Sequence, residues 1–183
     1  MKNFIYILMF MATVLCCVAL YGIKKKYSES GQLRDATPYI NGKEHDIKKR
    51  YYKSGELSWE TPYVNGKRHG VEKRYYKSGQ LFIEKPYVNG KRHGIEKGYH
   101  ESGQLWWETP YVNGKEHGVE KDYYVSGQLY IETPYVNGKR HGVEKRFTNK
   151  GEVISTAKYK NGVLDGYKRC SDGRFGNEDL KCQ

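Results

Sequence analysis

The sequence predicts an all-β fold: an elongated, curved antiparallel meander of repeated two-stranded hairpin units, preceded by an N-terminal transmembrane or signal helix. The stretch from Tyr63 to Pro86 begins again, nearly unchanged, at Tyr87, Tyr111 and Tyr135, which gives a period of 24 residues. All five prolines fall in one column of this self-alignment. A fixed period of this length is typical of arrays in which each unit buries its apolar side chains against its neighbours.

The chain divides into three parts: residues 1–23 form an N-terminal membrane anchor or signal segment, 24–168 the repeat array and 169–183 a C-terminal tail. Phe4 to Ile23 carries no charge over 20 residues, and a helix of that length matches the hydrocarbon thickness of a bilayer, about 30 Å. We expect this segment to anchor the chain in a membrane. The alternative is a secretory signal that is cut after Ala19, so that the body is secreted.

Two signals disagree about the side of the membrane. The lysines at 24–26 follow the apolar run and would hold the body in the cytoplasm under the positive-inside rule. The repeats contain no cysteine, whereas Cys170 and Cys182 flank a short tail at a spacing that suits a disulfide loop in an oxidising compartment. Two free thiols are the alternative. We expect the body to be extracytoplasmic, in the periplasm or at the cell surface.

Each unit contains two β-forming runs, residues 71–76 and 80–84 in the best copy, with Lys77-Ser78-Gly79 between them. This pattern predicts a hairpin. The next connection opens with Asn89-Gly90, a pair that favours the tight turns of antiparallel strands. Pro86 cannot donate to a sheet ladder, so we expect the strand to break or bulge at Lys85-Pro86, which would also bend the sheet once per unit.

The charges leave two hairpin registers open. A two-residue turn at Ser78-Gly79 would set Lys73 opposite Glu84 and Tyr75 opposite Phe82, which are favourable cross-strand pairs. A three-residue turn would place Gly79 in the left-handed conformation, which suits glycine, but it would face Glu72 with Glu84.

The elements Asn-Gly-Lys-x-His-Gly, x-x-Lys-x-Tyr-Tyr and Ser-Gly-Gln-Leu with a following Glu recur in register over about residues 24–168. They resemble the MORN repeat in its bacterial variant form. The resemblance implies β-hairpin units that stack into elongated sheets and act as scaffolds for protein contacts or membrane attachment. The bacterial variants are grouped with the YwqK-type toxin–antitoxin family, which implies an antitoxin role. With a membrane segment, such an antitoxin would meet a toxin acting at or beyond the membrane.

The net charge of +11 is distributed unevenly, from +4 for residues 63–86 to −2 for residues 111–134. A nucleic-acid track needs a continuous basic stripe, because phosphates are neutralised one after another, so we expect no nucleic acid as partner. Binding to an anionic lipid surface is the alternative function. It would depend on Lys67, Arg68, Lys139 and Arg140 and would weaken as salt rises.

Two polar columns invite a catalytic or metal-binding interpretation. The histidine column contains His45, His69, His93, His117 and His141. Equivalent residues lie two strands apart, about 9–10 Å, whereas ligands of one zinc ion each lie about 2 Å from it. The Ser–Gly pairs recur in equivalent turns rather than in one unique site. We therefore predict no catalytic residue, metal or cofactor, and the protein is not expected to be an enzyme.

Two columns after the conserved leucine of each copy change identity while the surrounding frame stays constant. The predicted partner-binding residues come from these columns: Trp59, Phe82, Trp106, Trp107 and Tyr130. Aromatic side chains serve both as packing groups and as interface anchors. Trp106 and Trp107 cannot both point to one face of a regular strand, so we expect one of them to be more exposed. The sequence thus predicts a non-enzymatic, membrane-associated scaffold that binds another protein. The resemblance implies, more specifically, that this partner is a toxin.

Overall fold

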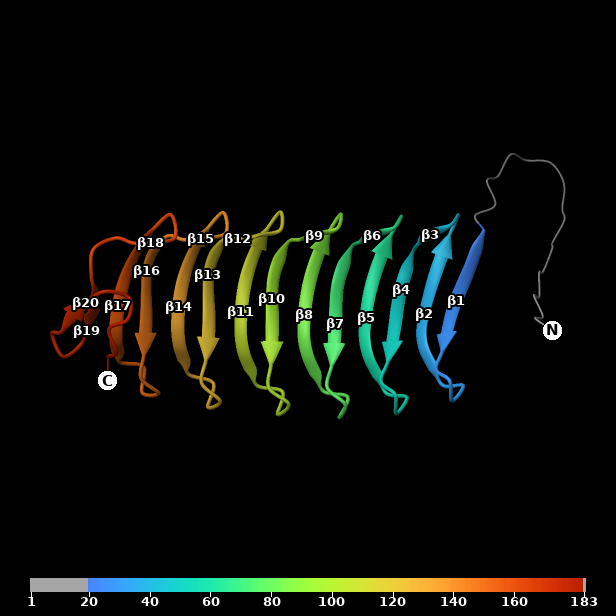
Figure 1. Ribbon diagram of the computed structural model, residues 1–183, viewed down its shortest axis with the longest axis horizontal. Coiled ribbons are helices and arrows are strands. Elements are labelled where there is room, and N and C mark those ends of the chain that lie inside the picture. Colours follow the sequence, from blue (N-terminus) through green and yellow to red (C-terminus); the bar gives the residue numbers. More distant parts are fainter. Residues whose placement is uncertain (1–19, 183) are drawn as a thin grey trace, which may run out of the picture.

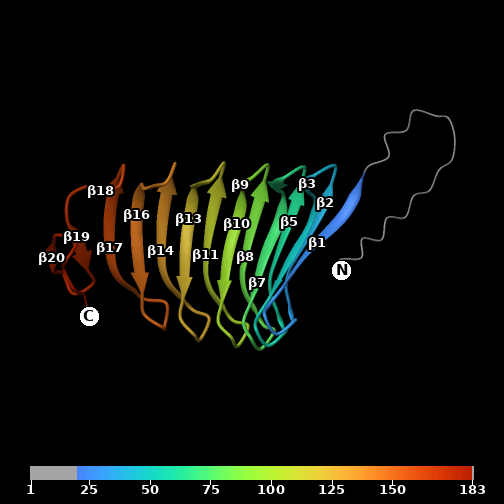
Figure 2. The same ribbon diagram turned by 45° about the vertical axis from the view of Figure 1, so that its right-hand side comes forward.

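The computed structural model describes residues 20–182 and consists of one antiparallel sheet in a single layer (Figure 1). In this part of the chain, twelve strands of six to eight residues lie side by side in sequence order. The strand at one end of the strip is inclined to the strand at the other end, so the sheet twists along its length (Figure 2). The predicted meander over residues 27–168 is confirmed.

The long strands are β1 (Tyr21–Tyr27), β2 (Leu33–Ile40), β4 (Asp46–Tyr51), β5 (Leu57–Val64), β7 (Gly70–Tyr75), β8 (Leu81–Val88), β10 (Gly94–Tyr99), β11 (Leu105–Val112), β13 (Gly118–Tyr123), β14 (Leu129–Val136), β16 (Gly142–Phe147) and β17 (Val153–Lys160). Two-residue ladders follow the Asn-Gly turns: β3 (Lys43–Glu44), β6 (Lys67–Arg68), β9 (Lys91–Arg92), β12 (Lys115–Glu116), β15 (Lys139–Arg140) and β18 (Val163–Leu164). The sheet ends with β19 (Lys168–Cys170) and β20 (Phe175–Gly176).

The predicted N-terminal helix falls mainly on residues that the structure does not describe. Its last residues from Tyr21 onward lie in β1, which pairs with β2 over its whole length. The sheet therefore begins a few residues before the predicted start of the array. No helix long and apolar enough to span a bilayer occurs between residues 20 and 182.

The hairpin combines parts of both predicted registers. Tyr76 N donates to Gln80 O and Gly79 N to Tyr76 O, which closes a three-residue turn with Gly79 at φ 85°. Beside the turn Tyr75 pairs with Leu81, but the next pair is Arg74 with Ile83, and Lys73 then faces Glu84. Phe82 is left without a partner, as in a β-bulge. The bulge thus joins the turn of one register to the charge pairing of the other.

The prediction of a strand break at Pro86 is wrong, because β8 continues through it to Val88. The interruption lies in the facing segment, between β9 and β10. Pro86 O accepts a hydrogen bond from His93 N at 3.0 Å, and Gly94 has φ 109° there. Since the N and C=O of one strand residue point to the same side, the missing N–H of the proline faces this interruption and leaves no ladder bond unmade.

The two faces of the sheet differ in burial. We call them the Tyr87 face, which carries Glu72, Ile83 and Tyr87, and the Pro86 face, which carries Tyr75 and Pro86. Apart from Pro38, every buried residue in the described range lies on the Tyr87 face. The buried residues include isoleucine, tyrosine and threonine but also glutamate, because a single layer has no second sheet to supply an apolar core.

Contacts between successive units connect the array along both rims. At the hairpin turns, the Tyr76 hydroxyl donates to Tyr99 O at 2.9 Å, and the equivalent tyrosines do the same in two other units. At the Asn-Gly turns, Gly90 N donates to Arg68 O at 2.8 Å. His141 Nδ1 accepts from Asn161 N at 3.5 Å, so a histidine of this column also reaches the next unit.

Candidate functional site

Aromatic rings form a row along the hairpin-turn end of the Tyr87 face. The bulge leaves the same column unpaired in every unit, and in three consecutive units this column holds Phe82, Trp106 and Tyr130. Tyr130 lines a hollow with Arg146 and Ser155, which places the bulge column on the Tyr87 face. Trp106 is 44% exposed and Tyr130 37%, so rings of this row remain accessible.

Each ring of the row packs on an aromatic residue from the turn of its own hairpin. The ring centroids are 4.7 Å apart for Tyr76 and Phe82, and 5.0 Å apart for Tyr124 and Tyr130. In the middle unit Trp106 stacks on the imidazole of His100 at 5.4 Å. These contacts hold the half-exposed rings in fixed orientations, which lowers the entropy that binding would cost.

The other two predicted anchors, Trp59 and Trp107, belong to the frame. The Trp59 ring lies between two guanidinium groups, with Arg74 Cζ 3.8 Å and Arg50 Cζ 5.1 Å from its centroid. The Trp107 indole covers Gly98, where a Cβ atom would collide with it. The bulge lets Trp106 and Trp107 share a face, which a regular strand would forbid, and Trp106 is the more exposed of the pair.

A charged ladder runs parallel to the ring row, nearer the Asn-Gly turns. Glu72 is fully buried and lies 3.2 Å from Arg74 Nη2 and 3.5 Å from Arg68 Nη1. Arg68 also donates to the Tyr87 hydroxyl at 2.8 Å and lies over that ring. Burial of a carboxylate is tolerated because both partners cover it with their aliphatic stems and neutralise it.

The unit around β13 replaces this ladder with acidic residues. Glu116, Glu120 and Asp122 occupy the positions of Arg68, Glu72 and Arg74. Burial raises the pKa of Glu120, the Thr109 hydroxyl opposes this by hydrogen bonding, and the nearby Asp122 and Glu116 carboxylates raise it further. Burial also raises the pKa of Asp122. The Tyr87 face therefore changes sign along the strip.

One rim carries a regular row of lysines. They occupy the first position of the first five two-residue ladders after the Asn-Gly turns, whereas β18 begins with Val163. All five lysines are exposed: Lys43, Lys67, Lys91, Lys115 and Lys139. Neighbouring lysines lie two strands apart, about 9–10 Å. This row is continuous even where the neighbouring unit is acidic.

The C-terminal tail folds back onto the last unit and covers part of the Tyr87 face. Cys170 and Cys182 are joined by a disulfide, with their Cα atoms 5.4 Å apart. Arg140 Nη2 donates to Glu178 at 2.7 Å, and Lys168 Nζ donates to Leu180 O at 2.7 Å. A hydrogen bond from Tyr159, and then Arg140, lowers the pKa of Glu178.

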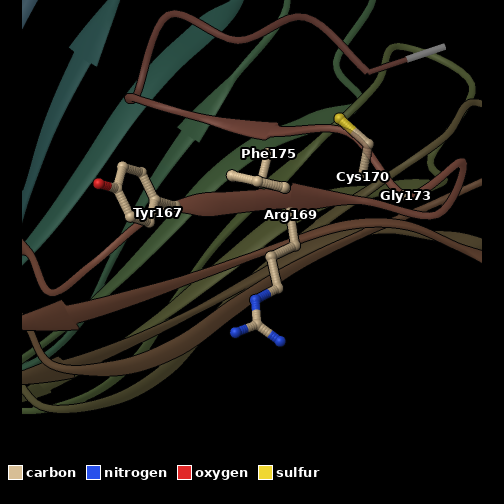
Figure 3. A pocket seen from close by; sticks show the side chains of 5 residues that line it. All are labelled: Tyr167, Arg169, Cys170, Gly173 and Phe175. Atoms are coloured by element: carbon tan, nitrogen blue, oxygen red, sulfur yellow. The ribbon is translucent and has the colours of Figure 1, made fainter.

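A separate pocket lies at this end of the sheet, lined by Tyr167, Arg169, Cys170, Gly173 and Phe175. Figure 3 shows the two rings near β19, with Arg169 pointing away from them. The rings of Tyr167 and Phe175 are 5.9 Å apart and largely exposed. No acid or base is held against a nucleophile in this pocket, and residues 20–182 contain no group of three metal-ligating side chains.

Two features of this face were missed by sequence reasoning. The glutamate column, with Glu72, Glu96 and Glu144 buried, was visible as an acidic residue that recurs in the four copies from Tyr63 onward. The docking of Glu178 on Arg140 was not visible, since no pattern in the sequence links residues that lie 38 positions apart.

A family model for the MORN repeat variant matches residues 20–41, 68–89, 92–113, 116–137 and 140–161. These segments make up more than half of the chain. They leave out most of residues 39–62, a more diverged copy of the unit that contains Trp59. A search of curated proteins found no match. Each matched segment spans one hairpin, that is, the hairpin turn and the long strand on either side of it, and ends at the Asn of an Asn-Gly pair. The chain therefore belongs to the MORN repeat variant family and is a β-hairpin repeat scaffold.

Proposed function

We propose that the protein is a non-enzymatic scaffold that binds another protein through the row formed by Phe82, Trp106 and Tyr130. The observation that carries this proposal is the packing of the row: three neighbouring rings are held by the turn aromatics, with Trp106 and Tyr130 exposed and Phe82 half-buried. Interface energy concentrates in a few such aromatic anchors. Trp106 is the main anchor, because it is the largest ring and the middle one.

The test compares capture of a partner by the full-length protein and by single variants. Trp106→Ala is expected to weaken binding by about 2 kcal/mol, roughly 30-fold, without changing the melting temperature. Val119→Ala is the matched control, because Val119 is 41% exposed but lies on the Pro86 face. If both variants bind like the parent, the aromatic row is not the interface.

A role in neutralising a toxin is the specific form of this proposal. It is supported by the resemblance of the unit to bacterial antitoxin repeats and by an exposed aromatic surface that suits a protein partner. Co-expression with a candidate toxin checks it. Wild-type protein should restore growth and Trp106→Ala should not. If both proteins restore growth, neutralisation of the toxin does not depend on the aromatic row.

We also propose that the uncharged N-terminal run ahead of β1 anchors the chain in a membrane and that the body is extracytoplasmic. The uncharged run supports the anchor, and the disulfide between Cys170 and Cys182 supports an oxidising compartment. Protease added to intact cells should then digest the body. Full-length, unprocessed chain in the soluble fraction would contradict the anchor.

Binding to an anionic lipid surface is a second candidate, favoured by the continuous lysine row on one rim. Vesicles with and without phosphatidylglycerol provide the measurement. Lipid binding predicts that Lys67→Gln and Lys91→Gln each weaken vesicle binding and that the effect fades with salt, while Trp106→Ala is neutral.

A further inference from the structure

The tail shows how an acidic segment lies on the Tyr87 face, with Glu178 in a turn in which Leu180 N donates to Asn177 O at 3.2 Å. Its Glu178 carboxylate meets Arg140 and Tyr159, and four residues later Cys182 is bonded to Cys170, which pairs with Ser155 on β17. Tyr159 and Ser155 are also four residues apart. The tail therefore runs along the strand from the Arg–Tyr pair to the bulge end of the sheet.

The same framework occurs on β8 without a tail. Arg68 lies over the Tyr87 ring, 5.0 Å from its centroid, as Arg140 lies over Tyr159. Both arginines direct Nη1 towards the buried glutamate of their unit, at 3.5 and 3.6 Å. Arg140 uses Nη2 for Glu178, whereas Arg68 Nη2 has no hydrogen bond or ion pair within residues 20–182.

Charge favours β8 over β11, the equivalent strand of the next unit. Arg68, Arg74, Lys85 and Arg92 surround the β8 position and outnumber the buried Glu72 and Glu96. On β11 the Tyr111 hydroxyl already donates to Glu116 at 3.3 Å, and the next unit is acidic. An incoming carboxylate would be attracted at β8 and opposed beyond it.

We propose that Arg68, with Arg92 beside it, binds a carboxylate of an acidic segment of the partner protein, which then runs along β8 towards Phe82. By analogy with the tail, the segment carries Asp or Glu followed four positions later by an apolar residue that reaches Ile83 and Phe82. This inference deepens the proposed function and rests on it only in taking the ligand to be part of a protein.

The probe is a fluorescent peptide with the sequence of residues 175–183 carrying Cys182→Leu, titrated against the full-length protein in non-reducing buffer. Saturable binding is expected. Arg68→Gln should weaken it about tenfold, the effect typical of a lost charged hydrogen bond. Glu178→Gln in the peptide should weaken it equally, with no further loss when both changes are combined.

The matched control is Lys67→Gln, which removes the same charge one residue away on the exposed rim and should change affinity less than about twofold. Tyr87→Phe keeps the ring and removes the hydroxyl, so it provides a second test of the same site if Arg68→Gln unfolds the protein. An unchanged affinity for Tyr87→Phe would then overturn the inference.

Three results would overturn the inference. These are no saturable binding, equal effects of Arg68→Gln and Lys67→Gln, and loss of binding by Arg140→Gln alone, which would mean that the probe only replaces the tail. Its failure is distinct from that of the proposed function. Suppose that Trp106→Ala abolishes capture of the partner while Arg68→Gln changes neither capture nor probe binding. The proposed scaffold function would then hold, and the proposed binding of an acidic segment at Arg68 would be wrong.

Discussion

The unit of residues 63–86 and the unit of residues 111–134 share one backbone and carry opposite charge on it. In the first, the fully buried Glu72 is held by two arginines. In the second, the equivalent Glu120 has acidic neighbours and a single hydroxyl donor, Thr109. The difference shows that the turns, the bulge and the proline register determine the fold, while the charged ladder is free to vary.

The largest expected effect tests the shared backbone. Gly70 and Gly118 have φ of 104° and 118°, and a Cβ atom there would lie 3.1 and 2.8 Å from the proline ring of the facing strand. Gly70→Val and Gly118→Val should each cost about 3 kcal/mol of stability, because backbone strain and overlap add. Thermal unfolding followed by circular dichroism measures both.

The diverged copy supplies the control for these glycines. Asp46 occupies the same column at φ 68° and accepts a hydrogen bond from Ile47 N, so its side chain compensates for the conformation. Gly118→Asn should therefore cost only about 1 kcal/mol. If Gly118→Val and Gly118→Asn lose similar amounts of stability, the positive φ is not what requires glycine at this position.

A smaller effect is expected from Glu72→Gln, which leaves Arg68 and Arg74 facing each other without a counter-charge. Removing one partner of a buried pair costs about 3–5 kcal/mol, but both arginines are partly exposed, so we expect about 2 kcal/mol. Urea unfolding at neutral pH provides the measurement, and Glu84→Gln on the Pro86 face is the control. A stable Glu72→Gln variant would mean that the ladder adds nothing to the fold.

The smallest effect should have the opposite sign. Folding raises the pKa of Glu120, so its protonated form is favoured in the folded state. Such a group contributes stability that is present below its unfolded pKa and is lost as pH rises through its folded pKa. Glu120→Gln should thus raise the melting temperature by about 2 °C at pH 7 and by nothing at pH 4. If Glu120→Gln instead lowers the melting temperature, Glu120 stabilises the fold as Glu72 does, and the proposed difference between the two units is wrong.

Much of the fold could be predicted because local chemistry repeats. The Asn89-Gly90 pair predicted a tight turn, and both residues have positive φ. The Ser78-Gly79 pair and the charge pairing of Lys73 each predicted part of the hairpin. The bulge at Phe82 could not be predicted, because the sequence does not reveal which residue of a strand is left without a cross-strand partner.

The proline column shows the same limit. The sequence reveals that Pro86 lacks a donor but not which neighbour that position faces, and the interruption lies seven residues later at His93. Within the candidate site, the five aromatic residues were predicted as one set. The structure separates Trp107 from Trp106 through Gly98 on the neighbouring strand, a contact that depends on register.

Between residues 20 and 168 each unit bonds only to its neighbours, so no contact in this part of the strip fixes the number of units. Each added copy lengthens it by two strands, about 9–10 Å, and presents the same turns to its neighbours. Duplication or loss of 24 codons would then change how far apart two bound segments sit without redesigning either. The spacing between bound segments would then change in steps of one unit, and three units carry the tyrosine–arginine pair that we propose as a binding point, at Tyr87, Tyr111 and Tyr159.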